Sequence, residues 1–230
     1  MQRTRIFLFV VVLAIIATCP SFARSAPPSI APIHSHPHGQ TYSAWAAEWW
    51  QWKLETPASV NPVLDITGEH CAEGQTGRVW FLAGTFFGNG TVERSCTVPT
   101  GTALFFPLIN AFYGAFLNDP PETLTEEFLR AQVVCTNVVV AAEIDGIAVN
   151  HPLQYFEQSP LFEVQLPEDN VFGVDEDVVP ELLLSPSVDA GYYLFLRPLS
   201  PGAHTIHWVA SQSCLFGDFA QEVTYHLRVR

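Results

Sequence analysis

Acidic side chains gather in one short stretch of the C-terminal half of the chain. Glu168 and Asp169 precede Asp175 and Asp177, with a mainly apolar segment between the two pairs. Oxygen donors of this kind bind Ca²⁺, but the spacing lacks the Asp-x-Asp-x-Asp-Gly start and the twelfth-position glutamate of an EF-hand loop. These four residues are candidate ligands of a structural calcium ion. The simpler interpretation is an exposed acidic loop, and the sequence indicates no other cofactor.

The cysteines have a spacing that favours disulfide bonds. Because Cys19 is expected to leave with the N-terminal signal peptide, Cys71, Cys96, Cys135 and Cys214 form an even set, which in an oxidising compartment predicts two disulfides. Three pairings are possible, and the modest loop between the first two cysteines favours Cys71 with Cys96 and Cys135 with Cys214. Each bond would contribute ~3 kcal/mol of stability in the loop-entropy description. Zinc is disfavoured, because no two of these cysteines are separated by two to four residues.

Motifs for hydrolytic catalysis are weak. The chain has no Gly-x-Ser-x-Gly elbow, and Ser211 and Ser213 do not substitute for one. Paired carboxylates can hydrolyse glycosides from positions far apart in sequence. Glu69, Glu168 and Asp169 are candidates for that role, but among 23 acidic residues some pair will always suit it.

Two groups of histidines could bind metal. His34, His36 and His38 alternate around prolines in a segment with no fixed geometry, which is typical of a solvated spacer. His204 and His207 stand three apart on an expected strand, so their side chains point to opposite faces. We expect both to be structural, with ring nitrogens bound by the backbone or by a neighbouring carboxylate.

The N-terminus has the three parts of a signal peptide. Arg3 and Arg5 precede an apolar run over residues 6–17, and small residues follow at 21–23. The run is shorter than the ~20 residues of a membrane-spanning helix, and no later stretch reaches that length uninterrupted. Residues 1–23 are therefore expected to be removed, and the mature chain is expected to lie outside the cytoplasm, secreted or periplasmic, without a transmembrane segment.

The charge balance disfavours two classes of partner. Without residues 1–23, the chain keeps 23 acidic and 8 basic residues, a net charge of −15 with neutral histidines. Lys53 is its only lysine. Nucleic acid and anionic membrane surfaces attract clustered positive charge, which this chain lacks.

The periodicity predicts two short helices and several strands. Trp45, Trp49 and Trp52 form one stripe of a helix capped by Ser43, and packing on a sheet explains them better than sugar stacking. Thr123 has the capping-box spacing for a second helix that ends near Val134. The expected strands are 78–84, 103–109, 137–144, 147–149, 192–196, 204–210 and 223–229, with Asp145-Gly146 as a hairpin turn.

Four stretches of the chain resemble a group of secreted bacterial proteins of uncharacterised activity. They are VWFLAGTF, CTVPTGTALFFPLIN, SPLFEVQLPEDNVFG and GYYLFLRPLSPGAHTIHW, in that order after a tryptophan-rich helix. The resemblance implies bacterial export and a single domain. It implies no activity and no catalytic residue.

These features predict a mainly β protein. We expect an antiparallel β-sandwich, Ig-like or jelly-roll, with two short covering helices over residues 41–230, after a flexible arm at 24–40. The favoured function is a secreted, non-catalytic binding or structural protein whose partner is an envelope glycan or protein. A secreted hydrolase of polysaccharide or ester substrates is the alternative.

Overall fold

The computed structural model describes residues 29–86 and 90–230, so the expected signal peptide at 1–23 lies outside the described residues. Its α-helices are α1 (Tyr42–Glu55) and α2 (Glu126–Gln132). Its strands are β1 (Val79–Phe81), β2 (Gly90–Val98), β3 (Ala103–Phe116), β4 (Cys135–Ile144), β5 (Ile147–Ala148), β6 (Phe156–Gln158), β7 (Phe162–Gln165), β8 (Leu183–Leu196), β9 (Gly202–Cys214) and β10 (Gly217–Val229).

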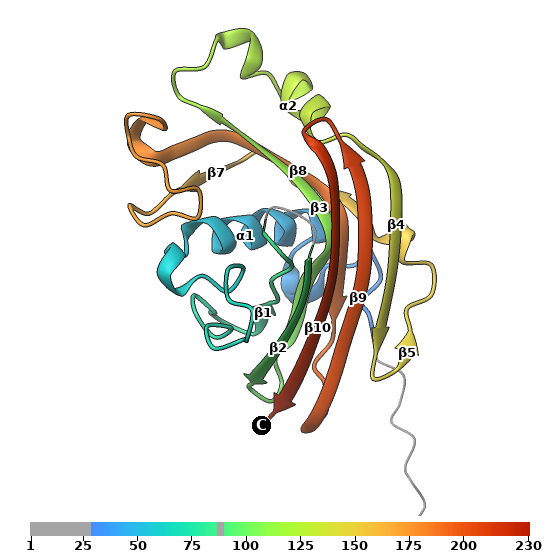
Figure 1. The fold of residues 1–230 in the computed structure, drawn as a ribbon. Helices are drawn as coiled ribbons and strands as arrows, with labels where there is room; N and C mark the ends of the chain where they lie inside the picture. Colours follow the sequence, from blue (N-terminus) through green and yellow to red (C-terminus); the bar gives the residue numbers. More distant parts are fainter. Residues whose placement is uncertain (1–28, 87–89) are drawn as a thin grey trace, which may run out of the picture.

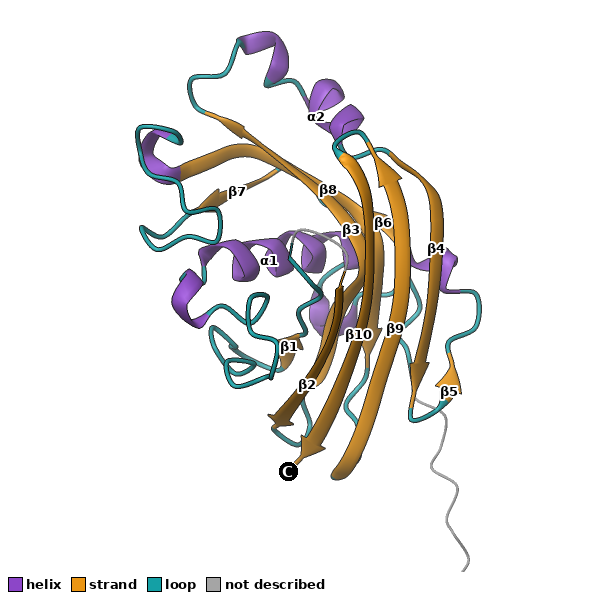
Figure 2. Cartoon of the chain, viewed as in Figure 1, coloured by secondary structure: helices purple, strands orange, loops and turns teal. Residues whose placement is uncertain are grey.

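The strands form two sheets (Figures 1 and 2). Sheet A has the order β1-β3-β8-β6, with β7 also paired to β8, and sheet B has the order β2-β10-β9-β4-β5. The mainly β class and the two helices are confirmed, and the sandwich type stays a prediction. The purely antiparallel arrangement is wrong, because β1 pairs with β3 and β2 with β10 in parallel. Neither pair is joined by a hairpin, so nothing in the connection forces the strands to run antiparallel.

Strand β3 is the centre of the core. Residues 103–109 are all buried, as their continuous apolar run predicts. Phe106 packs on Trp208 of sheet B, with ring centroids 5.1 Å apart. Phe105 stacks on Tyr193 within sheet A at 5.2 Å and also contacts Trp45 of α1. Sheet A therefore has sheet B on one face and α1 on the other, and the prediction that the tryptophan helix covers this strand is confirmed.

The helix caps differ from those expected. The Thr41 hydroxyl accepts the amide of Ala44 at 3.1 Å, whereas Ser43 is already inside the first turn of α1 and donates to the carbonyl of Gln158. In α2 the capping residue is Thr125, not Thr123, and the helix ends at Gln132 rather than near Val134. The reason is that residues 121–123 form a 3-10 turn that begins at Pro121, the second of two prolines, and this turn delays the start of the helix.

The hairpin at Asp145-Gly146 is confirmed. Both residues have positive φ, 54° and 72°, as a type I′ turn requires, and they join β4 to β5. His204 and Asp145 pair beside this turn, with Nδ1 and Oδ2 2.7 Å apart. His207 meets Glu222 at 3.2 Å, so both histidines contact neighbouring carboxylates as expected.

Of the arm expected at 24–40, residues 24–28 lie outside the described residues, and residues 29–40 make hydrogen bonds to the rest of the domain. The amide of Ala31 donates to the carbonyl of Phe195 at 2.8 Å, and the Tyr42 hydroxyl donates to the carbonyl of Ala31 at 2.6 Å. The Trp45 indole donates to the carbonyl of Pro37. These hydrogen bonds attach the segment to α1 and to the end of β8. Within the described residues, no helix is long and apolar enough to cross a membrane.

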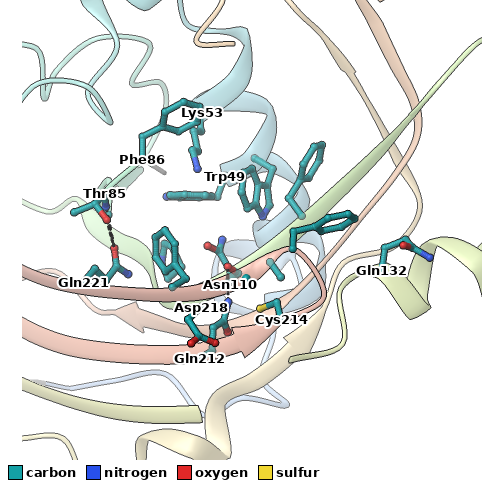
Figure 3. A pocket seen from close by; sticks show the side chains of 18 of the residues that line it. Trp49, Lys53, Thr85, Phe86, Asn110, Gln132, Gln212, Cys214, Asp218 and Gln221 are labelled. Atoms are coloured by element: carbon teal, nitrogen blue, oxygen red, sulfur yellow. Dashed lines mark hydrogen bonds between the residues drawn. The ribbon is translucent and has the colours of Figure 1, made fainter. Parts of the chain in front are cut away.

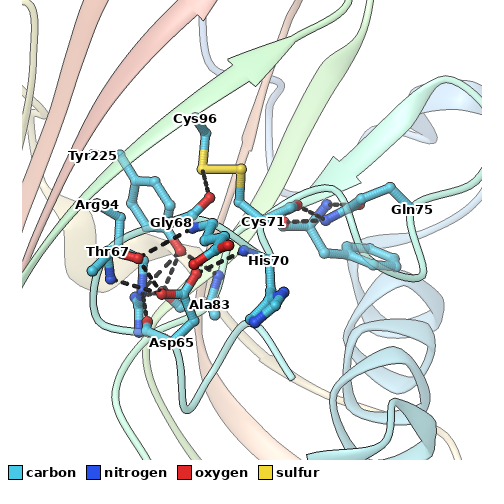
Figure 4. The surroundings of a disulfide bond; sticks show 12 residues. Asp65, Thr67, Gly68, His70, Cys71, Gln75, Ala83, Arg94, Cys96 and Tyr225 are labelled. Carbon is cyan, nitrogen blue, oxygen red and sulfur yellow. Dashed lines mark hydrogen bonds between the residues drawn. A yellow bond between two sulfur atoms is a disulfide. The ribbon is translucent and has the colours of Figure 1, made fainter. Parts of the chain in front are cut away.

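Both disulfides have the pairing that the sequence favours. Cys71 bonds to Cys96 across 25 residues, and Cys135 bonds to Cys214 across 79 residues. Figure 4 shows that the first bond attaches the irregular segment after α1 to β2. The second bond joins opposed residues of β4 and β9.

Replacing Cys71 and Cys96 together by serine should lower the free energy of unfolding by ~3 kcal/mol, because the unfolded chain regains the freedom of the closed loop. Urea unfolding followed by tryptophan fluorescence measures the change. Thr97→Ala on the exposed face of the same strand is the matched control and should shift stability by less than ~0.5 kcal/mol. Equal midpoints for the double variant and the control would contradict a stabilising role for this disulfide.

Candidate binding cavity

An uncovered strand edge creates the candidate site. Strand β1 pairs with β3 only at residues 103–105, and among the described residues no other strand pairs with the same edge of β3 farther along. There the carbonyl of Leu108 accepts the side-chain amide of Gln221 at 2.6 Å, and the carbonyl of Asn110 accepts that of Gln212 at 3.0 Å. Two glutamines of sheet B thus satisfy backbone groups that a strand would otherwise bind, and they leave space beside them.

A cavity of about 370 Å³ lies in this space, lined mainly by apolar side chains. Its walls come from α1, from the segment after β1, from β3 and from the β9–β10 hairpin (Figure 3). The lining residues include Trp49, Trp50, Lys53, Gly84, Thr85, Phe86, Pro107, Asn110, Phe112, Phe172, Gln212, Cys214, Phe216, Asp218, Phe219 and Gln221. Cavities with aromatic walls and a few polar groups are the usual form of small-molecule sites.

Aromatic rings form one wall of the cavity. Trp50 stacks on Phe112 with centroids 4.6 Å apart and planes inclined by 28°, and Trp49 meets Trp50 edge-on at 5.1 Å. Trp49 is held by donating its indole N–H to the carbonyl of Leu82 at 3.0 Å. The tryptophan-rich helix therefore does more than pack on the sheet, because two of its rings line a ligand-sized space.

Lys53 enters the cavity from α1, as Figure 3 shows. Its side chain is buried, with 6% of its surface exposed, and its Nζ lies 4.1 Å from the ring centroid of Trp50. The rings of Phe86 and Trp49 are 5.1 and 5.3 Å away. Aromatic faces attract an ammonium group, but they replace its lost hydration only in part.

Behind Trp50 lies a buried carboxylate. Asp189 Oδ2 accepts the Trp50 indole N–H at 2.7 Å and the Tyr193 hydroxyl at 2.6 Å. Asn110, which lines the cavity, donates to the same hydroxyl at 3.0 Å. Asp189 Oδ1 is buried without a hydrogen-bond partner in the described structure. Trp50 and Asn110 thus connect the cavity to a buried acid.

Burial shifts both charged groups toward their neutral forms. Desolvation lowers the pKa of Lys53 to about 7, although the charge of Asp189 opposes the shift. Desolvation likewise raises the pKa of Asp189 to about 7, against the hydrogen bonds from Tyr193 and Trp50 and the charges of Arg130 and Lys53. The cavity therefore has an amine that is partly neutral at physiological pH.

Arg94 positions another part of the wall. It is only 1% exposed, and its guanidinium donates to the carbonyls of Ala83 and Gly84 at 2.8 and 3.0 Å and to that of Asp65 at 2.6 Å. Gln221 accepts the backbone amide of Thr85 at 2.9 Å, a bond drawn in Figure 3. The segment from Ala83 to Thr85 is therefore held against sheet B.

The acidic residues singled out in the sequence lie away from this cavity. Asp169 accepts the backbone amide of Ser59 at 3.0 Å, and Asp175 accepts that of Asp177 at 3.1 Å. Within the described residues, no group of three or more His, Cys, Asp or Glu side chains could hold a metal ion. The calcium site at Glu168, Asp169, Asp175 and Asp177 thus has no geometric support and stays a prediction.

Glu69, the remaining hydrolase candidate, is exposed and lies in the segment between α1 and β1. Glu69 does not line the cavity, and the segment that carries the four acidic residues contributes Phe172 to the lining but none of its carboxylates. The residues that sequence reasoning missed are Lys53 and Asp189. One signal was available, because a lone lysine inside a run of tryptophans is unusual in a surface helix.

Comparisons with models of protein families, with curated proteins and with solved structures find no match for this chain. The resemblance to secreted bacterial proteins stays a prediction.

Proposed function

We propose that this chain is an extracytoplasmic binding protein that holds a small, largely apolar compound in the cavity beside β3. The observation that carries the proposal is the cavity itself, a space of about 370 Å³ with stacked aromatic rings on one side and side-chain amides on the other. Flat or aliphatic groups gain from burial against such rings. The side-chain amides of Asn110 and Gln212 line the cavity and can orient one polar group of the ligand by hydrogen bonding.

The compartment and the non-catalytic role are part of the same proposal. Two disulfides and the N-terminal leader expected from the sequence support a place outside the cytoplasm. An envelope glycan or protein was the partner inferred from the sequence. The mainly apolar lining and the volume of about 370 Å³ favour a compound smaller and less polar than either, and no observation favours the hydrolase alternative.

Benzyl alcohol is a suitable probe, because it joins one ring to one hydroxyl group. Titration should change the fluorescence of Trp49 and Trp50 in a saturable way and raise the melting temperature by mass action. Phe112→Ala removes the ring that stacks on Trp50 and should weaken binding about tenfold, since the lost stacking and buried area amount to roughly 1.4 kcal/mol.

Phe156→Ala is the matched control, because this ring is 45% exposed and contacts Tyr192 rather than the cavity wall. It should leave the affinity unchanged. A linear, unsaturable fluorescence change, or equal losses in both variants, would count against ligand binding in this cavity.

A further inference from the structure

Lys53 combines features that packing alone does not require. A methionine would fill the same volume in an apolar wall without the cost of burying an amine. Yet the only lysine of the chain lies here. It is 6% exposed, and its Nζ lies over the Trp50 ring. In the described part of the chain, no hydrogen bond or ion pair to this Nζ is present. The amine is therefore directed into the cavity and is free to contact a ligand.

We propose that Lys53 captures carbonyl compounds, with its Nζ condensing reversibly with an aldehyde or an unhindered ketone held in the cavity. The proposal deepens the proposed function, since it assigns a chemical class to the ligand of the same site. An uncharged carbonyl compound fits apolar walls better than an anion does, and the net negative charge of the chain does not repel it.

The reaction balances within the site. The neutral Nζ attacks the carbonyl carbon, an N–C bond forms as the C–O π bond breaks, and one proton passes from the nitrogen to the oxygen to give a neutral carbinolamine. The hydroxyl then leaves as water with the second hydrogen of the nitrogen, and the C=N bond of an imine forms, so one water molecule is released for each carbonyl bound. Hydrolysis reverses the sequence, and no oxidant or reductant is consumed.

The surroundings favour the reactive form of the amine. Lysines become nucleophiles when an apolar site holds them neutral at working pH. The lowered pKa of Lys53 meets this condition, since about half of the amine is neutral near pH 7. Two acids belong to the surroundings: Asp189 lies behind Trp50 on β8, and Asp218 lines the cavity at the β9–β10 hairpin. The charge of Asp189 favours the ammonium, so the chemistry depends on the desolvation that burial imposes on the amine.

Reductive trapping with benzaldehyde and sodium cyanoborohydride tests the proposal. The folded, disulfide-bonded mature chain should acquire a benzyl group on Lys53, identified by peptide mass mapping, with a rate that rises with pH through a midpoint near 7. After unfolding in urea at pH 7, the labelling of Lys53 should slow at least tenfold, because an exposed lysine is almost wholly protonated there. The α-amino group serves as the internal reference, because the chain has no other lysine.

Two controls separate this proposal from the binding function. Lys53→Arg keeps a long cation that cannot form an imine, and peptide mapping should find no adduct at position 53. In the wild-type chain, excess benzyl alcohol should slow the labelling of Lys53 but not that of the α-amino group.

Labelling confined to the α-amino group would overturn carbonyl capture, as would a labelling midpoint near 10 for Lys53. If benzyl alcohol still bound saturably in that case, the binding function would stand without the imine. If neither probe engaged the cavity, both proposals would fall.

Discussion

Replacing Arg94 by methionine is expected to lower the free energy of unfolding by about 5 kcal/mol, the largest effect of any single substitution discussed for this chain. The guanidinium is 1% exposed and donates to backbone carbonyls of Asp65, Ala83 and Gly84. Methionine fills the space but donates nothing, and each buried acceptor left unpaired costs ~1–3 kcal/mol. Removing the guanidinium also removes the cost of burying a cation. The net loss of stability is therefore smaller than the sum of the costs of the unpaired acceptors.

The loss should extend to the cavity. Arg94 bonds to the carbonyls of Ala83 and Gly84 and so attaches them to sheet B, and Figure 4 shows Arg94 beside Ala83. The next two residues, Thr85 and Phe86, line the cavity. Binding of benzyl alcohol should therefore weaken in Arg94→Met even at temperatures where the variant is folded.

Urea unfolding and the benzyl alcohol titration measure the two effects. Arg228→Met is the matched control, because Arg228 is exposed on β10 in the same sheet and should change stability by less than ~0.5 kcal/mol. Arg94→Lys should be intermediate, since an ammonium cannot reproduce the planar fork of donors. Equal stabilities of Arg94→Met and Arg228→Met would show that the buried network contributes nothing.

Arg94 also shows why strand β2 could not be predicted from the sequence pattern. Strand β2 was not expected, because its centre reads Thr91, Val92, Glu93 and Arg94, with an arginine at an inward position. The strand is possible only because carbonyls from two distant segments converge on the guanidinium. That convergence is a tertiary property, which local periodicity does not contain.

Features with local causes were predictable. The apolar run of β3, the Asp145-Gly146 turn and the tryptophan stripe of α1 each depend on neighbouring residues, and the structure contains all three. Long strands were underestimated where small or polar residues enter them. For example, β8 begins at Leu183 rather than at Tyr192, and the added part includes the buried polar residues Ser187 and Asp189.

The cavity depended on non-local geometry as well. It exists because β1 ends after three residues and because Gln212 and Gln221 reach across to the open edge of β3. Neither event has a sequence signature. The isolated lysine was visible in the sequence, but Asp189, the buried acid bonded to Trp50, lies more than a hundred residues away and could not be associated with it.

Lys53 and Asp189 together predict an unusual dependence of stability on pH. For Asp189 the folded pKa lies above the unfolded value of 3.8, so the folded state binds more protons between about pH 4 and 7, and stability falls as the pH rises through that window. For Lys53 the folded pKa lies below 10.5, so the unfolded state binds more protons between about pH 7 and 10, and stability rises with pH there. The pair therefore contributes a minimum of stability near pH 7.

Lys53→Met should isolate the part of this pH dependence that comes from Lys53, the rise in stability between about pH 7 and 10. Below pH 7 the variant should be more stable than the wild type by on the order of 4 to 5 kcal/mol, because it no longer buries a cation whose pKa falls from 10.5 to about 7, at 1.36 kcal/mol for each unit. The advantage should shrink steadily above pH 7 and be small near pH 10, where the wild-type amine is neutral in both states. Urea unfolding at intervals between pH 5 and 10 measures it.

Asp189→Asn tests the contribution of Asp189, the fall in stability between about pH 4 and 7. The amide oxygen of the variant still accepts hydrogen bonds from Trp50 and Tyr193, but the amide does not titrate. Relative to this variant, the wild type should lose stability between pH 4 and 7 and remain level above it. If the stability difference between Lys53→Met and the wild type were the same at every pH, Lys53 would titrate at its ordinary value. The amine would then be an ammonium held by the aromatic rings, and a cation at this position would have to be matched by an anion in the cavity rather than by a carbonyl group.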